Sequence, residues 1–440
     1  MSLNQNIEPK TFCIKNNQAY IGGCNLVELV EKYGTPLYVY DEETIRDICA
    51  DYKNSFKNYE NVSLMFASKA FMTKAIAAIM QSEGFGLDVV SGGEIYTAYK
   101  AGFDMSKALF NGNNKTLDEI ELALKVGVGR FSVDNFYEIE NLGKISNEKN
   151  QKIDILLRIT PGIECHTHEY IQTGHLDSKF GFDLTQLDDA INAIKKYPNL
   201  NLKGLHAHLG SQIFETQVYK DAVGVILEQF AKIKNNFGID LTEMNIGGGL
   251  GITYTTEDTP PEIATIADLI MDAIKENCQK YNLSMPKLFL EPGRSIVGTS
   301  GVALYKVGSS KQVPNGRKYV ALDGGMADNP RPSMYQAKYT AIVANKAEDK
   351  NTETVTLAGR FCESGDIIIK DIALPVLEPQ DVVCVFNTGA YGYSMSSNYN
   401  RVLKPTVVLV KSGQSDIIIK GETYDDLISH DVIPPRLEKP

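Results

Sequence analysis

The chain has 440 residues, of which 43% are hydrophobic and 22% are charged, ordinary proportions for a globular enzyme. Its formal net charge of −11 argues against binding to nucleic acid or to an anionic membrane. No apolar run approaches the roughly twenty residues that span a bilayer, and the polar first ten residues do not resemble a signal peptide. Seven cysteines without a Cys-x-x-Cys pair predict reduced thiols and a cytoplasmic protein.

The first 36 residues predict a hairpin, with strands at 11–15 and 19–21, and then a helix at 25–33. From residue 37 to 297, strand-like segments alternate with helical patterns. Eight strands are expected, at 62–66, 86–90, 108–111, 130–134, 153–160, 202–208, 243–247 and 288–291. This alternation over about 250 residues predicts a closed (β/α)8 barrel, or TIM barrel. A doubly wound open sheet is the alternative, because periodicity does not report closure.

After Pro292 the pattern changes to short β-rich runs without helices between them. These runs lie at 302–307, 318–322, 354–357, 366–372, 381–386, 406–410 and 416–419. Turns rich in glycine, asparagine and aspartate separate them. We therefore predict an all-β domain, a barrel or a sandwich, formed by residues 298–440 and joined by residues 1–36.

Lys69 lies where the first barrel strand passes into a helical segment, a costly place for an ammonium group. Burial there lowers the pKa of a lysine, so that its neutral amine can act as a nucleophile or as a Schiff-base partner. The alternative is a lysine whose side chain extends from the strand end into solvent. What favours the first interpretation is the set of groups at the other strand ends.

In a barrel of this kind the chemistry gathers at the carboxyl ends of the strands. Asp88 ends the second predicted strand, and a glycine run, 247–251, ends the seventh. The run leaves backbone N–H groups open to a phosphate, although it matches neither a Walker loop nor a dinucleotide fingerprint. With Ser211 and Arg294 at neighbouring strand ends, one phosphate monoester is the ligand that fits.

Glu291 and His208 suit a flat heteroaromatic cofactor. A carboxylate beside a pyridine nitrogen keeps it protonated, and the ring then withdraws electrons from a bound carbanion. An ion pair between Glu291 and Arg294 is the alternative. His208 could stack on such a ring, or it could be a core histidine that bonds a backbone carbonyl.

The histidines also allow a metal site. His166-x-His168 and His206-x-His208 both have the spacing of metal ligands, as in a metal-dependent TIM-barrel hydrolase. The first pair lies in a predicted loop, and a hydrolase would leave Lys69 and the glycine run without a role. We therefore expect no metal.

Three segments stand out in the predicted β domain. Segment 359–366 places Cys362 beside Glu363 in an acidic turn, although a cysteine there could also be inert packing. Segment 389–395 is rich in glycine and tyrosine. Segment 329–335 offers an arginine and a tyrosine suited to a carboxylate, or it is a proline-stiffened surface loop.

Together these motifs resemble the fold type III, alanine-racemase-like decarboxylases that depend on pyridoxal phosphate. Within that family the resemblance is to the branch that acts on meso-2,6-diaminopimelate. It covers nearly the whole chain through FASK (66–69), RITPG (158–162), HTHEYI (166–171), DSKFGF (177–182), HLGSQ (208–212), EPGR (291–294), CESGD (362–366) and GAYGYSMSSNY (389–399).

The resemblance implies a role for each matching residue. Lys69 would hold pyridoxal 5'-phosphate as a Schiff base beside Asp88, with His208 on the ring and Glu291 on its nitrogen. Cys362 would return a proton to the α-carbon. The phosphate would contact Ser211, Gly248, Gly249, Gly293, Arg294 and Tyr391. The substrate's distal end would contact Arg294, Arg331, Tyr335, Tyr391 and Glu363.

The implied activity is decarboxylation of meso-2,6-diaminopimelate to L-lysine and CO2, the last step of bacterial lysine biosynthesis. The implied assembly is a homodimer with shared active sites, in which Cys362 and Glu363 come from the partner subunit. A decarboxylase of ornithine, arginine or carboxynorspermidine is the alternative within the fold. Such a substrate lacks a distal carboxylate and would leave Arg331 and Glu363 poorly used, which works against its binding.

Overall fold

The computed structural model describes residues 3–163 and 178–437. The chain divides into two compact units, which we call the barrel unit (Met1–Ile7 and Thr44–Thr299) and the β unit (Glu8–Glu43 and Ser300–Pro440). The segment with His166 and His168 lies outside the described residues. No helix within the described ranges is long and apolar enough to cross a membrane.

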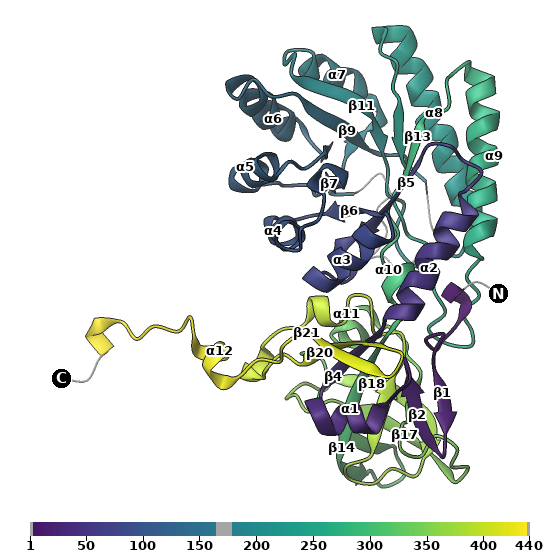
Figure 1. The fold of residues 1–440 in the computed structure, drawn as a ribbon, viewed down its shortest axis with the longest axis vertical. Helices are drawn as coiled ribbons and strands as arrows, with labels where there is room; N and C mark the ends of the chain where they lie inside the picture. The colour runs from purple at the N-terminus through teal and green to yellow at the C-terminus, as the bar shows by residue number, and fades with distance from the viewer. Residues whose placement is uncertain (1–2, 164–177, 438–440) are drawn as a thin grey trace. The chain divides into compact units, whose positions relative to one another are not determined.

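The barrel unit is a closed parallel barrel of eight strands within the part of the chain that the structure describes (Figure 1). The strands are β5 (Val62–Ala67), β6 (Gly86–Val89), β7 (Ala108–Phe110), β8 (Arg130–Val133), β9 (Ile153–Thr160), β11 (Leu200–His206), β12 (Glu243–Asn245) and β13 (Lys287–Leu290). Pairing of β8 with β9 and of β13 with β5 completes the closure. The prediction of a closed barrel is therefore confirmed, and the open sheet is wrong.

Helices follow the strands, and several begin at a polar N-cap. Thr73, Ser91, Thr116 and Asn135 each accept a bond from a backbone N–H three residues on, which stabilises the first turn. Inside the barrel, Met65, Leu109, Leu156 and Phe289 form a buried apolar cluster. The helices are α2 (Glu42–Ser55), α3 (Lys74–Ser82), α4 (Gly92–Lys100), α5 (Leu117–Val126), α6 (Phe136–Glu148), α7 (Leu187–Ile194), α8 (Gln217–Phe237), α9 (Ile263–Tyr281) and α10 (Arg294–Val297).

Short elements complete the barrel unit. The two-residue strand β10 (Phe182–Asp183) extends the sheet by pairing with β9. The 3-10 turns are η1 (Leu3–Gln5), η2 (Ser68–Ala70), η3 (Met105–Lys107) and η5 (Leu184–Gln186).

The β unit contains two sheets. An antiparallel sheet of β1 (Cys13–Lys15), β2 (Gln18–Ile21) and β3 (Cys24–Asn25) precedes helix α1 (Leu26–Tyr33), whose N-cap is Asn25. The larger sheet has the order β18-β17-β15-β14-β4-β20-β21, and β19 joins it through β14 and carries β16. Its strands are β4 (Leu37–Asp41), β14 (Gly301–Gln312), β15 (Lys318–Leu322), β16 (Ala341–Val343), β17 (Thr352–Ala358), β18 (Ile367–Pro375), β19 (Val382–Val385), β20 (Thr406–Lys411) and β21 (Gln414–Ile419).

Short helices lie in the β unit's connections: α11 (Arg331–Tyr335), η6 (Tyr393–Met395), η7 (Tyr399–Arg401), α12 (Tyr424–Ile428) and η8 (Pro435–Leu437).

The boundary between the units differs from the expected 37–297 and 298–440 at the amino-terminal side. Strand β4 pairs antiparallel with β14 and parallel with β20, so residues 37–43 belong to the β unit. All five residues of β4 are buried, and a short strand buried on both faces has the same sequence pattern in either kind of sheet. Residues up to Ile7, expected in the β domain, belong to the barrel unit.

Candidate active site

Lys69 lies at the carboxyl end of the barrel, in the turn η2 directly after β5. Its Nζ is 3.6 Å from Oδ2 of Asp88, a fully buried residue of β6, while the lysine side chain is 37% exposed. Burial raises the pKa of the Asp88 carboxyl, Glu291 raises it further, and Lys69 lowers it. The predicted position of Lys69 at the strand end is therefore confirmed, but its amine is only partly buried.

Glu291 is the buried carboxylate at the centre of this end of the barrel. It follows β13 directly and is 3% exposed. Its Oε1 accepts hydrogen bonds from Nδ2 of Asn245 at 2.7 Å and of Asn111 at 3.1 Å, and Nε2 of His206 lies 3.5 Å from Oε2. Burial raises the pKa of Glu291, but its interaction with His206 outweighs burial and holds the pKa well below its usual range. Glu291 therefore stays ionised.

The amide of Asn111 joins the two acids. Its Nδ2 donates to Oδ1 of Asp88 at 2.5 Å as well as to Glu291. Lys69, Asp88, Asn111 and Glu291 thus form one chain of polar contacts across four strand ends, with the amine at its exposed end.

His208 is a neutral ring in this arrangement. The backbone N–H of Gly248 donates to its Nδ1 at 3.3 Å, so this nitrogen is an acceptor. Burial lowers the pKa of His208 well below its ordinary value, and the charges of Lys69 and Arg158 lower it further. An uncharged imidazole held against the glycine run suits stacking on a flat ring.

Gly248 and Gly249 of the glycine run approach neighbouring backbone too closely for any side chain. A Cβ on Gly248 would lie 2.1 Å from the carbonyl oxygen of Glu291, and one on Gly249 would lie 2.6 Å from that of Gly210. Gly249 also has a φ of +101°, a conformation that favours glycine. Only glycine therefore fits at these two positions, and the absence of side chains there permits the close approach of a phosphate.

Arg294 lies beside the glycine run and is almost fully buried. Its guanidinium donates to the hydroxyl of Tyr254 at 2.7 Å and to that of Ser211 at 2.8 Å. The predicted grouping of Ser211 with Arg294 is therefore confirmed. No ion pair between Arg294 and Glu291 occurs within the described residues, since Glu291 is held by amides and His206.

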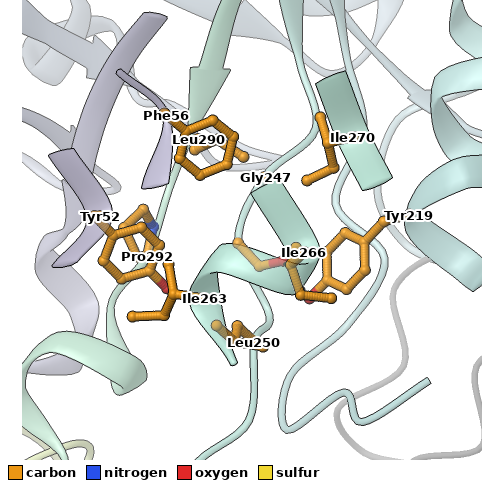
Figure 2. Close-up of a pocket in the computed structure, with 11 residues that line it drawn as sticks. Tyr52, Phe56, Tyr219, Gly247, Leu250, Ile263, Ile266, Ile270, Leu290 and Pro292 are labelled. Atoms are coloured by element: carbon orange, nitrogen blue, oxygen red, sulfur yellow. Dashed lines mark hydrogen bonds between the residues drawn. The ribbon is translucent and has the colours of Figure 1, made fainter. Parts of the chain in front are cut away.

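A small apolar pocket lies against Gly247 and Gly248 (Figure 2). Figure 2 shows side chains of α2, α8 and α9 around it, among them Tyr52, Ile266 and Ile270, together with Phe56, which follows α2. The Tyr219 hydroxyl at its edge donates to the carbonyl of Gly248 at 3.4 Å. The apolar side chains that line this pocket thus surround one side of the glycine run.

The β unit brings together three of the predicted substrate-binding residues. The guanidinium carbon of Arg331 lies 5.9 Å from the ring centre of Tyr335 and 5.8 Å from that of Tyr391. Arg331 is 8% exposed, so the alternative of a plain surface loop does not describe it.

The acidic turn places Cys362 and Glu363 on the surface of the β unit. Cys362 is exposed, whereas Cys24, Cys49, Cys278 and Cys384 are buried. Glu363 accepts a short hydrogen bond from the Tyr399 hydroxyl. The interpretation of Cys362 as buried packing is therefore wrong.

Several polar residues near Lys69 and Glu291 were not predicted from the sequence: Glu94, Asn111, Ser132, His206 as a partner of Glu291, Asn245 and Tyr254. Most follow or end a barrel strand, and that position was the available signal. Burial raises the pKa of Glu94 to about 7, and its side chain accepts a bond from the N–H of Val90 at 2.7 Å. For metals, no group of three acidic, histidine or cysteine side chains within residues 3–163 and 178–437 is placed to hold an ion.

Comparison with known proteins decides the family. The model of the pyridoxal binding domain of pyridoxal-dependent decarboxylases matches residues 42–298. The chain belongs to the pyridoxal-dependent decarboxylases. It is 49% identical to the diaminopimelate decarboxylase of Synechocystis sp. over 99% of this chain and 95% of that protein. It is 46% identical to that of Bacillus subtilis over 94% of each chain.

The fold of this pyridoxal-dependent decarboxylase is also found in solved structures. The crystal structure of diaminopimelate decarboxylase from m. jannaschii in co-complex with L-lysine superposes with a TM-score of 0.92. The two sequences are 35% identical, and the match covers 98% of this chain and 99% of that one.

The barrel unit fits the cofactor that the family name states. The hydroxyl oxygen of Ser68 and Oδ1 of Asn111 are buried and have no hydrogen-bond partner in the described ranges. Buried polar atoms need partners, and a polar ligand beside Lys69 would supply them. The glycine run and Arg294 offer donors to a phosphate, which completes the fit.

Proposed function

We propose that this decarboxylase converts meso-2,6-diaminopimelate to L-lysine and CO2. The observation that carries the chemistry is the amine of Lys69, 3.6 Å from a buried acid that shares the amide of Asn111 with the ionised Glu291. The substrate assignment is supported by relatives named diaminopimelate decarboxylase at 39–49% identity and by the L-lysine bound to the m. jannaschii protein.

The barrel unit would hold the cofactor. Lys69 would bond it covalently beside Asp88, the neutral ring of His208 would stack on it, and the Glu291 carboxylate would accept a hydrogen bond from the protonated pyridine nitrogen. The phosphate contacts are Ser211, Gly248, Gly249, Gly293, Arg294 and Tyr391. When bound, pyridoxal phosphate supplies an electron-withdrawing ring that takes up the electron pair left by the departing carboxylate.

The other residues hold the substrate and move a proton. The arginine of α11 binds the distal carboxylate with Tyr335, Tyr391 and Arg294, because a guanidinium matches a carboxylate with two parallel bonds. Glu363 pairs with the distal ammonium. The thiol of Cys362 gives its proton to the α-carbon after CO2 leaves.

We further propose that two copies of the chain share their active sites, each β unit giving Cys362 and Glu363 to the other copy. The exposure of both residues supports this arrangement. We propose a cytoplasmic location, since the described cysteines are all unpaired thiols.

Chemical trapping tests the role of Lys69. Borohydride reduction of the protein with pyridoxal phosphate is expected to fix the cofactor to the peptide that contains Lys69. Lys69→Ala removes the amine, so covalent trapping and CO2 release should both fall to background. Lys74→Ala, which changes an exposed lysine at the start of α3, is the matched control and should retain both. Label found on another lysine contradicts the assignment.

The substrate is tested by CO2 release from diaminopimelate, ornithine and arginine. Discrimination of about 10²-fold or more in favour of diaminopimelate is expected, because the other substrates offer Arg331 no distal carboxylate to bind. Arg331→Leu should remove most of this preference. Equal rates on ornithine would assign the chain to another basic amino acid.

A further inference from the structure

Ser132, His206 and Glu291 form a buried row of polar contacts across three barrel strands. Ser132 is on β8, His206 ends β11, and Glu291 follows β13; each is at most 3% exposed. The hydroxyl of Ser132 lies 2.7 Å from Nδ1 of His206, and Nε2 of His206 lies 3.5 Å from Oε2 of Glu291. Nothing in the proposed chemistry yet uses Ser132 or His206.

The contact to Ser132 determines whether Nε2, the imidazole nitrogen that faces Glu291, carries a proton. When the hydroxyl donates to Nδ1, the ring carries its proton on Nε2, because the bond made by one nitrogen fixes the state of the other. Nε2–H is then directed at Oε2, the oxygen of Glu291 that Asn111 and Asn245 do not contact. The row therefore places an N–H group 3.5 Å from the second carboxylate oxygen, an electrostatic contact that is longer than an ordinary hydrogen bond.

The position of Ser132 is itself fixed by a buried cation. Lys115 is 5% exposed, and its ammonium donates to the carbonyl of Ser132 at 2.7 Å and to that of Gly112 at 2.8 Å. Oε1 of Glu138, 2.6 Å away, balances its charge. These contacts connect the loop after β7 to β8 and α6 and hold the serine opposite His206.

We propose that Ser132 and His206 are positioning residues for the cofactor: the hydroxyl directs the imidazole, and Nε2–H keeps the Glu291 carboxylate aimed at the pyridine nitrogen. This inference rests on the proposed function, in which Glu291 meets that nitrogen. Neither residue touches the reacting atoms. Both act by keeping Glu291 charged and oriented in a buried place, where an unsupported carboxylate would take up a proton.

Two amide substitutions at one position separate this role from a structural one. The amide nitrogen of Gln can take the place of Nε2, whereas that of Asn can reach only the place of Nδ1. His206→Gln should bind pyridoxal phosphate within about threefold of the wild type, and His206→Asn about 10- to 100-fold more weakly, since a bond to a charged group is lost. The measurement is titration of the cofactor-free protein, followed by the absorption spectrum of the bound cofactor.

Ser132→Ala should weaken cofactor binding in the same direction by about tenfold. Its matched control is Ser146→Ala, which removes another buried hydroxyl, bonded to the carbonyl of Gly143 at 2.7 Å in α6, and should leave the affinity and the spectrum unchanged. A folding defect caused by loss of the imidazole would affect His206→Gln and His206→Asn alike. The decisive quantity is therefore the difference in cofactor affinity between these two variants.

The positioning role is overturned if His206→Asn and His206→Gln bind the cofactor equally well with the same spectrum. In that case the wild-type chain still binds pyridoxal phosphate and releases CO2, so the proposed function stands. A wild-type chain that binds no pyridoxal phosphate overturns the proposed function and this inference together.

Discussion

Cys362 is the exposed residue on which the proposed proton-transfer step depends. Its thiol lies in the turn that Asp366 holds by accepting bonds from the N–H groups of Phe361 at 2.9 Å and Met326 at 2.7 Å. Loss of a positioned general acid typically costs about 10²–10⁴-fold in rate. Cys362→Ala should therefore lower kcat by this factor while cofactor affinity stays the same. Cys13→Ala, in β1, should change neither, and full activity of Cys362→Ala would remove the thiol from the mechanism.

Asp328 makes the stability of the β unit depend on pH. Its carboxylate accepts bonds from the Tyr305 hydroxyl at 2.5 Å and from the N–H of Gly325 at 2.8 Å, and burial raises its pKa to about 7. The unfolded chain loses this proton near pH 4, so between about pH 4 and 7 only the folded form holds it. Folding then takes up a proton, and the free energy of unfolding falls as the pH rises through this window.

Asp328→Asn tests this pH dependence, because the amide imitates the protonated acid at every pH. Urea unfolding at pH 5 and pH 7.5 should show the wild type losing about 2.5 kcal/mol more than the variant over that range. Equal losses in the two proteins would show that Asp328 does not hold a proton in the folded state.

Among single residues, the sequence could identify those whose chemistry is visible in the chain, such as Lys69, the glycine run and Arg294. It could not identify Asn111, Asn245 or Ser132, because an asparagine or serine at a strand end has no chemical signature of its own. Their partners lie more than 20 residues away and meet them only when the barrel closes. The amides that hold Glu291 are therefore a consequence of the fold.

At the scale of elements, the first turn, η1, shows what a short segment can stabilise. Asn4 is fully buried, and its Nδ2 donates to the carbonyls of Pro261 at 3.0 Å and Gly251 at 3.3 Å. Both carbonyls belong to the long connection between β12 and α9, which also carries Tyr254, the partner of Arg294. The polar start of the chain thus supports a loop of the candidate active site.

Asn4→Ala should lower the free energy of unfolding by about 1–3 kcal/mol, because it leaves buried carbonyls without a donor. Gln5→Ala, which removes a less buried bond to the carbonyl of Pro260 at 3.0 Å, is the control and should cost less. Urea denaturation of both variants measures the difference. Equal stability of Asn4→Ala and the wild type would show that η1 does not support the loop.

Element prediction succeeded where the pattern repeats and was incomplete where an element is short. All eight barrel strands were found because each precedes a clear change from strand to helix periodicity. The three-residue strand β16 has no such contrast, and β4 was assigned to the wrong unit. The strands that pair with β4, which are β14 and β20, lie more than 250 residues away in the sequence. Only tertiary pairing therefore places β4 in the β unit.

At the scale of the whole molecule, the barrel unit carries the candidate cofactor site and the β unit carries the candidate proton donor. If two copies share their sites, a defect in Lys69 and a defect in Cys362 can be separated within one dimer. A mixed dimer of Lys69→Ala and Cys362→Ala has one site with both defects and one site with neither.

Mixing the two variants and allowing subunits to exchange should therefore restore activity that neither variant has alone. Random exchange makes half of the dimers mixed, and each mixed dimer has one intact site of two, so about a quarter of the wild-type rate is expected. CO2 release before and after exchange measures the recovery, and native mass spectrometry of the mixture, in which the mixed dimer has an intermediate mass, measures the extent of exchange. No recovery after complete exchange would mean that each chain completes its own site, since both defects then stay in separate sites.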